Sequence, residues 1–310
     1  KEQAQAARAA EGPILVIAGA GSGKTKTLTH RIAHLIFNEK VPAGAILAVT
    51  FTNKAAREMR ERVLTLLGAR FSGNFFMAEE SGRVPMIGTF HSVCARILRV
   101  NAEAAGYSRG FTIFDADDSE KLLKQCMLAL NISPKEFSPR VFLRIIEQAK
   151  QKNIAPDEFE EQFAGDLRSP IDDYAPRLYK RYQGELKRLN CCDFGDLLFQ
   201  TVRLWQNHPD ILKQYQRKWH YIHVDEYQDT NFIQYELCRI LASANRNLFV
   251  VGDEYQSIYS FRGADMGNIL NFTRDYKGAQ TVVLEENYRS TGSILALANR
   301  IMKKAKIHIT

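Results

Sequence analysis

The sequence predicts an α/β protein with a parallel sheet and an inserted all-helical subdomain, and three observations lead to this prediction. Short apolar runs alternate with helical segments, an order that is typical of a parallel sheet with helices on both faces. The chain of 310 residues is longer than one small core requires, which favours two compact units or one unit with a large insertion. Between about residues 93 and 190, only helical periodicity is found.

Six short apolar runs are the expected strands of the sheet. Their near-continuous apolar character suits strands that are buried on both faces, because an exposed face would require alternating polar residues. The runs are Ile14–Ala18, Ile46–Thr50, Met86–Gly88, Tyr221–Asp225, Leu248–Gly252 and Thr281–Leu284.

The segment between the third and fourth expected strands has apolar stripes with a helical period. Its proline residues are expected to separate the helices; they are Pro134, Pro139, Pro156, Pro170 and Pro176. The simplest interpretation is a helical subdomain, residues 93–190, inserted into an α/β core formed by residues 1–92 and 191–278.

Composition narrows the possible classes of protein. No apolar run approaches the roughly 18 residues needed to span a bilayer, and the segment KEQAQAARAAEGP lacks the apolar region of a secretory signal. We therefore expect no membrane partner and a cytoplasmic location. The net charge of +7 and the pI near 9.1 favour a polyanionic partner.

The cysteine and histidine spacings do not predict a metal site. The five cysteines include one adjacent pair, Cys191 and Cys192, and no C-x-x-C motif, so buried reduced thiols are expected. His30 and His34 could share one helix face, but no third ligand is evident nearby, which favours a solvated or packed pair.

The stretch AGAGSGKT, residues 18–25, predicts a phosphate-binding loop between a strand and a helix. Glycine lets successive backbone N–H groups point at phosphate oxygens, and the following helix N-terminus favours an anion. Lys24 would contact the β- and γ-phosphates and the Thr25 hydroxyl would bind Mg²⁺. An ordinary glycine-rich turn is the alternative. The expected cradle is Gly19, Ala20, Gly21, Ser22 and Gly23.

A second apolar strand ends in carboxylates in YIHVDEYQDT, residues 221–230. Asp225 is expected to hold Mg²⁺ beside Thr25, and Glu226 to position or deprotonate the attacking water. The alternative is that Asp229 and Thr230 cap the next helix. Capping does not account for two adjacent carboxylates at a buried strand end, which are costly without a cation.

Four further stretches carry a resemblance to a known family: TFTNKAAREM (50–59), GTFHS (88–92), VVGDEYQSIYSFRGAD (250–265) and LEENYRST (284–291). Together with the phosphate loop and DEYQD, in this order, they resemble the UvrD/Rep/PcrA-type superfamily 1A DNA helicases. Ala18, where the general loop pattern has glycine, is usual in that family. The resemblance implies a RecA-like P-loop NTPase sheet and runs from residue 1 to about residue 300.

The resemblance implies roles for residues outside the loop. Gln3 would read adenine, Tyr288 would stack on it, and Lys26 stands near the base where the family favours arginine. Gln256 would sense the γ-phosphate and link it to DNA. Arg289 would act as an arginine finger on the γ-phosphate. ATP and Mg²⁺ are the implied cofactors.

Aromatic residues beyond expected strand ends favour a nucleic-acid track, because ligands bind there in open α/β sheets. Stacking on a base contributes about 1–3 kcal/mol and tolerates any sequence. Core packing is the alternative for Phe90 and Phe194, and a solvated face is the alternative to duplex contact for the basic helix around Lys180. The expected DNA-contacting residues are Phe51, Thr52, Asn53, His91, Phe194, Tyr259, Phe261 and Arg262.

The family's motor has two RecA-like domains, and we expect the second only to begin here, in residues 279–310. The resulting hypothesis is the ATPase half of a 3′→5′ DNA helicase or translocase. Its expected partners are single-stranded DNA, the single-strand/duplex junction, the remaining motor domain and possible repair or replication proteins. The alternatives are a motor subunit of a RecB-like helicase–nuclease and an ATP-gated DNA-binding module with little hydrolysis. A nucleoside kinase fits the loop alone but leaves the aromatic residues unexplained.

Overall fold

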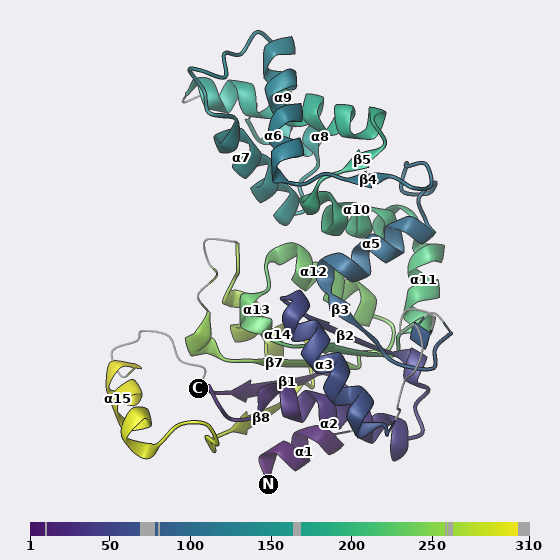
Figure 1. Ribbon diagram of the computed structural model, residues 1–310, viewed down its shortest axis with the longest axis vertical. Coiled ribbons are helices and arrows are strands. Elements are labelled where there is room, and N and C mark those ends of the chain that lie inside the picture. The colour runs from purple at the N-terminus through teal and green to yellow at the C-terminus, as the bar shows by residue number, and fades with distance from the viewer. Residues whose placement is uncertain are drawn as a thin grey trace. The chain divides into compact units, whose positions relative to one another are not determined.

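The computed structural model describes residues 1–9, 11–68, 78–79, 81–163, 169–257, 259 and 263–302. The chain forms two compact units, one from residues 1–90 and 212–310 and one from residues 91–211. It passes from the first unit to the second within α5 (Phe90–Val100) and returns within α11 (Pro209–Lys218). In Figure 1 the second unit carries the teal part of the colour scale.

The first unit contains a six-stranded sheet in the order β3-β2-β6-β7-β1-β8 within the described residues. Every pairing is parallel, so the carboxyl ends of all six strands lie at one edge. The strands are β1 (Ile14–Ala18), β2 (Ile46–Thr50), β3 (Met86–Thr89), β6 (Tyr221–Val224), β7 (Leu248–Gly252) and β8 (Gln280–Leu284).

The α/β prediction and all six expected strands are confirmed, with ends that differ by at most one residue. The last strand lies in the segment expected to begin a second domain, residues 279–310, and the structure places it in this sheet. Leu284 of β8 is the register partner of Ala18, and β8 pairs with β1 along its whole length. Sequence could not decide this, because an apolar run does not specify the sheet that it joins.

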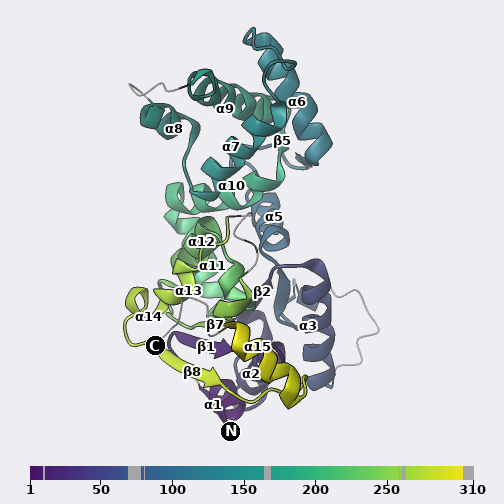
Figure 2. The same ribbon diagram turned by 90° about the vertical axis from the view of Figure 1, so that its left-hand side faces the viewer.

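Helices cover both faces of this sheet, as Figure 2 shows. On one face, α1, α2 and α3 bury a core of aliphatic side chains that includes Leu28, Ile32 and Met59. On the other side of the sheet lie α12, α13 and α14. The helices and 3₁₀ turns of the first unit are α1 (Glu2–Arg8), α2 (Lys24–Phe37), η1 (Ala43–Ala45), α3 (Asn53–Leu66), η2 (Tyr227–Asp229), α12 (Phe232–Ala242), η3 (Glu254–Gln256), α13 (Gly267–Leu270), α14 (Phe272–Asp275) and α15 (Gly292–Met302).

Two helices next to the carboxyl edge begin at capping side chains. The Thr52 hydroxyl accepts a hydrogen bond from Ala55 N, which starts α3. Asn231 starts α12 through a reciprocal capping box with Gln234. Thr230 was the expected N-cap of α12, and the cap lies one residue later. The Thr230 hydroxyl instead donates to the carbonyl of Tyr227.

The second unit is mainly helical, as the sequence predicts. Buried aliphatic and aromatic side chains of α6, α7 and α9, including Leu123, Phe142 and Tyr182, make one core. The elements are β4 (Thr112–Ile113), α6 (Ala116–Ala129), α7 (Pro139–Gln151), α8 (Pro156–Phe163), α9 (Pro170–Arg188), β5 (Cys191–Cys192) and α10 (Phe194–Asn207).

Three expectations about this region need correction. A two-residue strand, β4, occurs where none was expected and pairs in parallel with β5. Pro176 lies inside α9 and does not end it. The compact unit also extends to residue 211, whereas the sequence placed residues from 191 onward with the sheet. The reason is that β5 and α10 pack on the helical unit, a tertiary contact with no local signal.

Across the residues that the structure describes, none of the helices has the length and apolar character needed to cross a bilayer.

Candidate functional site

The loop between β1 and α2 has a backbone shape that requires glycine. Gly21 and Gly23 have φ values of +77° and +87°, which side-chain-bearing residues rarely adopt. A Cβ atom at Gly23 would lie 2.6 Å from the Gln3 amide nitrogen, and one at Gly21 would lie 2.6 Å from Arg289 Cβ. The helix that follows, α2, has 14 residues and no side chain that caps its N-terminus. Its first backbone N–H groups are therefore suited to bind an anion.

Residues from both ends of the chain meet this loop. Gln3 in α1 donates a hydrogen bond of 2.6 Å to the carbonyl of Ser22, and the Ser22 hydroxyl donates to Gly19 at 2.7 Å. The backbone N–H of Tyr288 donates to the Gly21 carbonyl at 2.9 Å. The Asn287 amide also donates to the Ala20 carbonyl. The structure therefore brings the expected residues Gln3, Tyr288 and Arg289 to the loop.

Asp225 directly follows β6 and faces the first turn of α2. The Thr25 hydroxyl donates to Asp225 Oδ2 at 3.0 Å, so the two expected Mg²⁺ ligands are adjacent. Burial raises the pKa of the Asp225 carboxyl to about 6, and the neighbouring charge of Glu226 adds to the effect. A hydroxyl and a buried carboxylate that share one spot fit Mg²⁺, which usually takes one or two protein ligands together with phosphate oxygens.

Glu226 is held in an unusual backbone conformation beside Lys24. Its φ of +52° lies in the left-handed region, where a residue other than glycine is strained. Its Oε2 lies 3.1 Å from the Nζ of Lys24, whose side chain is 9% exposed. The lysine of the loop and the carboxylate expected to activate water therefore form an ion pair.

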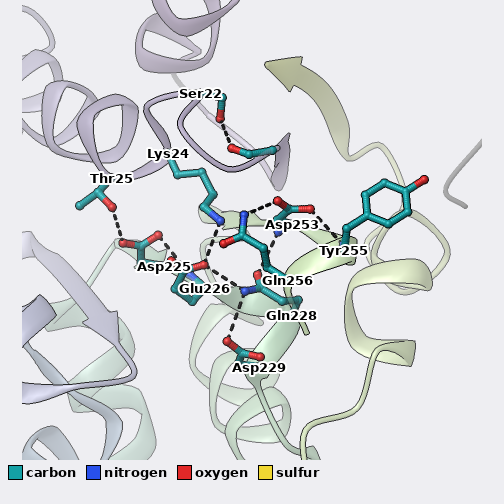
Figure 3. Close-up of polar contacts among 11 residues, drawn as sticks. Ser22, Lys24, Thr25, Asp225, Glu226, Gln228, Asp229, Asp253, Tyr255 and Gln256 are labelled. Carbon is teal, nitrogen blue, oxygen red and sulfur yellow. Dashed lines mark hydrogen bonds and ion pairs between the residues drawn. The ribbon is translucent and has the colours of Figure 1, made fainter. Parts of the chain in front are cut away.

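A buried amide connects this carboxylate with the next strand end. Gln228 donates to Glu226 Oε2 at 3.0 Å and to Asp229 Oδ2 at 3.3 Å. Its oxygen accepts from the backbone N–H of Asp253, just beyond β7, at 3.0 Å. Gln256, in η3, donates to the Asp253 carboxylate. Figure 3 shows these side chains converging with Lys24 at the carboxyl edge of the sheet.

A cavity of about 380 Å³ opens beside the loop, on the side of α1. Gln3 and Lys26, both expected near a base, line it. Two alanines and an arginine of α1 and three polar side chains of α2 complete the lining: Ala4, Ala7, Arg8, Thr27, His30 and His34. The cavity therefore lies between α1 and α2, and Gln3, which lines it, also bonds to Ser22 of the loop.

In the described residues, His30 and His34 each contact a protein oxygen and do not face a shared metal site. The His30 ring lies 2.8 Å from the Lys26 carbonyl oxygen, and the His34 ring 3.3 Å from Glu39. Over the same residues, no group of three or more His, Cys, Asp or Glu side chains could hold a metal ion. All five cysteines are free and buried, as expected.

The aromatic residues expected beyond the strand ends fall into separate groups. In the first unit, the rings of Phe51 and Tyr259 lie 5.0 Å apart, next to the exposed N-terminus of α3 at Thr52 and Asn53. Phe90 is 6% exposed and belongs to the core, which supports the packing alternative for that residue. Phe261 and Arg262 lie outside the described residues.

In the second unit, His91 and Phe194 form a stacked pair with ring centroids 3.9 Å apart. Phe194 is 59% exposed, so core packing does not account for it. Burial lowers the pKa of His91 to about 4. The imidazole is therefore neutral near pH 7, and it can reach a phosphate as a hydrogen-bond donor but not as a cation.

The basic helix α9 carries ion pairs that favour the solvated-face interpretation. Lys180 lies 3.0 Å from both Asp157 and Glu160, and Arg181 and Arg188 both pair with Glu185. These pairs neutralise much of the charge that a duplex contact would need.

Comparison with known proteins decides the family. A family model described as the UvrD/REP helicase N-terminal domain matches residues 1–277. The chain belongs to this family. It is 46% identical over 301 residues to a protein named ATP-dependent DNA helicase PcrA from Leuconostoc citreum, covering 97% of this chain and 38% of the relative.

Two further relatives of the same name agree. The PcrA proteins of Staphylococcus epidermidis and Staphylococcus aureus are 46% identical over 302 residues, covering 97% of this chain and 39% of theirs. The chain thus spans about two-fifths of the length of the relatives it matches.

Sequence reasoning missed the polar residues that join the motifs. Gln228 lies within the DEYQD stretch of this UvrD/REP family member, two residues after Glu226, and Asn287 lies within the NYRS stretch. Each amide bonds to a distant part of the chain: Gln228 to Asp253, just after β7, and Asn287 to Ala20, in the loop after β1. The only available signal was their place inside motifs, because an amide has no charge or periodicity that indicates its partner.

Proposed function

We propose that the chain is the ATPase half of a 3′→5′ DNA helicase or translocase, which couples Mg²⁺-dependent ATP hydrolysis to movement along single-stranded DNA. The observation that carries the proposal is the adjacency of the loop and the acidic strand end. Thr25 lies 3.0 Å from Asp225, and Lys24 lies 3.1 Å from Glu226. The relatives named ATP-dependent DNA helicase PcrA are consistent with this proposal.

Each polar side chain then has a role in phosphoryl transfer. Thr25 and Asp225 would hold Mg²⁺, which would supply positive charge to neutralise the charge that develops on the phosphates. Lys24 leaves Glu226 for the phosphates, and Arg289, beside Gly21, adds charge at the γ-phosphate. Glu226, freed from the lysine, accepts the proton of the attacking water.

The adenine base is proposed to occupy the cavity beside the loop. Gln3 presents an amide that can read the base edge, and Lys26 lines the same cavity. Tyr288 is 65% exposed while its backbone is anchored to Gly21, so its ring is available for stacking on the base. Specificity for adenine would depend on the Gln3 amide.

DNA binding is proposed at two aromatic pairs, one in each unit, of which the Phe194 ring is exposed. Phe51 with Tyr259 and Phe194 with His91 offer flat faces that accept any base. Thr52 and Asn53, at the N-terminus of α3, can bind backbone phosphates there. Phe261 and Arg262 belong to the same proposal on sequence grounds.

Partners and cellular setting are also proposals. The single-strand/duplex junction, the remaining motor domain and repair or replication proteins are the proposed partners. The first motor domain is proposed to end after β8, with the segment from Glu285 leading toward the second. Five free, buried cysteines suit a reducing, cytoplasmic setting.

Steady-state ATP hydrolysis with and without an oligo-dT strand tests the proposal. We expect hydrolysis that is stimulated by DNA, and a Glu226→Gln variant that binds ATP but loses nearly all turnover. Near-normal kcat in this variant would refute the assignment of the base. DNA binding with no hydrolysis above the Glu226→Gln baseline would instead favour an ATP-gated binding module.

A further inference from the structure

The side chain of Gln228 forms hydrogen bonds to the segments that follow two neighbouring strands, β6 and β7. It is 1% exposed, and its amide makes hydrogen bonds on both sides. The nitrogen donates to Glu226 and Asp229, which follow β6, at 3.0 and 3.3 Å. The oxygen accepts from the N–H of Asp253, which follows β7, at 3.0 Å. One neutral group therefore joins the acidic strand end to the segment that carries Gln256.

The surrounding backbone keeps this amide in place. An added Cβ at Gly252 would lie 2.9 Å from the Gln228 oxygen, so only glycine lets β7 approach so closely. The Ser257 hydroxyl donates to the Gln228 carbonyl at 3.3 Å, on the far side of η3. Movement of the segment 253–257 would therefore pull on the Gln228 amide and, through it, on Glu226.

The same geometry makes Glu226 dependent on Gln228. Its Oε2 has two side-chain contacts in the described structure, the Lys24 ammonium and the Gln228 amide. A bound phosphate competes for Lys24, because the loop directs that lysine to phosphate oxygens. The amide is then the contact that remains to orient the carboxylate, whose backbone is already in a strained conformation.

We propose that Gln228 is a positioning residue that orients Glu226 for water activation and connects it to the Asp253–Gln256 segment, so that a change in this segment alters the rate of hydrolysis. The inference rests on the proposed function, because it assumes that Glu226 activates water. In this role Gln228 touches neither phosphate nor DNA and acts through Glu226 and the Asp253 segment.

Amide chemistry is essential to this role. The group must donate to carboxylates on one side and accept from a backbone N–H on the other, which glutamine does without adding charge. In a Gln228→Glu variant the acceptor for Asp253 N–H is kept, but the donor is lost and a charge is placed beside Glu226 and Asp229. In Gln228→Met the length and volume are kept and all three side-chain hydrogen bonds are lost.

The test compares these variants with a matched control. Gln234 is also buried, 3% exposed, and is hydrogen-bonded through its side chain, to Asn231 N, but it does not contact Glu226. Gln234→Met therefore removes a buried amide from the same region without affecting the carboxylate. ATP affinity, KM, kcat and stimulation by oligo-dT are measured for each variant, with Glu226→Gln as the baseline.

We expect Gln228→Met and Gln228→Glu to bind ATP within about twofold of the wild type while kcat falls roughly 100-fold, the loss typical of a misplaced reacting group. The residual turnover should respond less to oligo-dT. Gln234→Met should keep both kcat and stimulation, even where its melting temperature falls.

Two results would overturn the inference alone. One is a kcat within threefold of the wild type for both Gln228 variants while Glu226→Gln is inactive. The other is a parallel loss of ATP affinity, kcat and stability that Gln234→Met reproduces, which would indicate a merely structural amide. Wild-type turnover no higher than that of Glu226→Gln would instead refute the proposed function, and the inference with it.

Discussion

Replacement of Lys150 by methionine should destabilise the helical unit strongly. The ammonium group is 1% exposed and lies 2.7 Å from Asp193 and 3.0 Å from Asp196. Tyr182 and Gln183 donate to the same two carboxylates. Burial alone would lower the pKa of Lys150, but the two carboxylates outweigh it and hold that pKa well above its usual value. The lysine is therefore charged in the core.

The magnitude follows from what the substitution leaves behind. Methionine fills much of the space but leaves the two carboxylates buried without their cation. Removing one partner of a buried ion pair costs about 3–5 kcal/mol in the free energy of unfolding. At about 1.4 kcal/mol per factor of ten, the unfolding equilibrium constant should rise roughly 10²- to 10⁴-fold.

Lys180 offers a matched control on the same unit. It also makes two ion pairs of 3.0 Å, with Asp157 and Glu160, but its side chain is 58% exposed. Lys180→Met should cost no more than about 1 kcal/mol. Urea unfolding followed by fluorescence in a Trp219→Phe background, so that Trp205 in α10 is the only tryptophan, measures both variants.

The pH dependence gives a second check with a defined sign. Burial, reinforced by Asp193, already raises the pKa of Asp196, and loss of the lysine should raise it further. A carboxyl whose folded pKa exceeds its unfolded value gains stability as pH falls, so the deficit of Lys150→Met should shrink below neutral pH. Equal, small losses for Lys150→Met and Lys180→Met, independent of pH, would refute the reasoning.

Three further predictions concern the site and the sheet. Gly23→Ala should lower ATP affinity about tenfold or more, because the added Cβ would meet the Gln3 amide and the backbone has a φ of +87°. Calorimetry measures the affinity and the melting temperature, and the melting temperature should change little. Unchanged affinity would contradict this prediction. Phe194→Ala should weaken oligo-dT binding by about 1–3 kcal/mol, measured by fluorescence anisotropy, while ATP affinity stays constant. An equal loss of DNA affinity and ATP affinity would argue against a DNA contact. Burial and then the charge of Arg31 lower the pKa of His223 well below its usual value. A histidine whose folded pKa lies below its unfolded pKa costs stability as pH falls through about 6.5. Between pH 7 and 5, urea unfolding should therefore show that the wild type loses more stability than His223→Leu. Parallel curves of stability against pH for the two proteins would refute this.

Local pattern was sufficient to predict the phosphate loop, the acidic strand end and the strands of the sheet. Gly21 and Gly23 are needed by the backbone of the loop itself, and the Asp225–Glu226 pair is adjacent in the chain. Such features follow from neighbouring residues, so they are visible in a single sequence. The same is true of the helical period of the inserted segment.

Tertiary structure alone decided which distant residues meet. It joined β8 to β1, extended the helical unit to residue 211 and put the Gln228 amide between two strand ends. These outcomes depend on sheet order and on hydrogen bonds between residues far apart in the chain. Neither is encoded in the period or composition of a short segment, because a strand or an amide accepts many partners until the rest of the chain has folded around it.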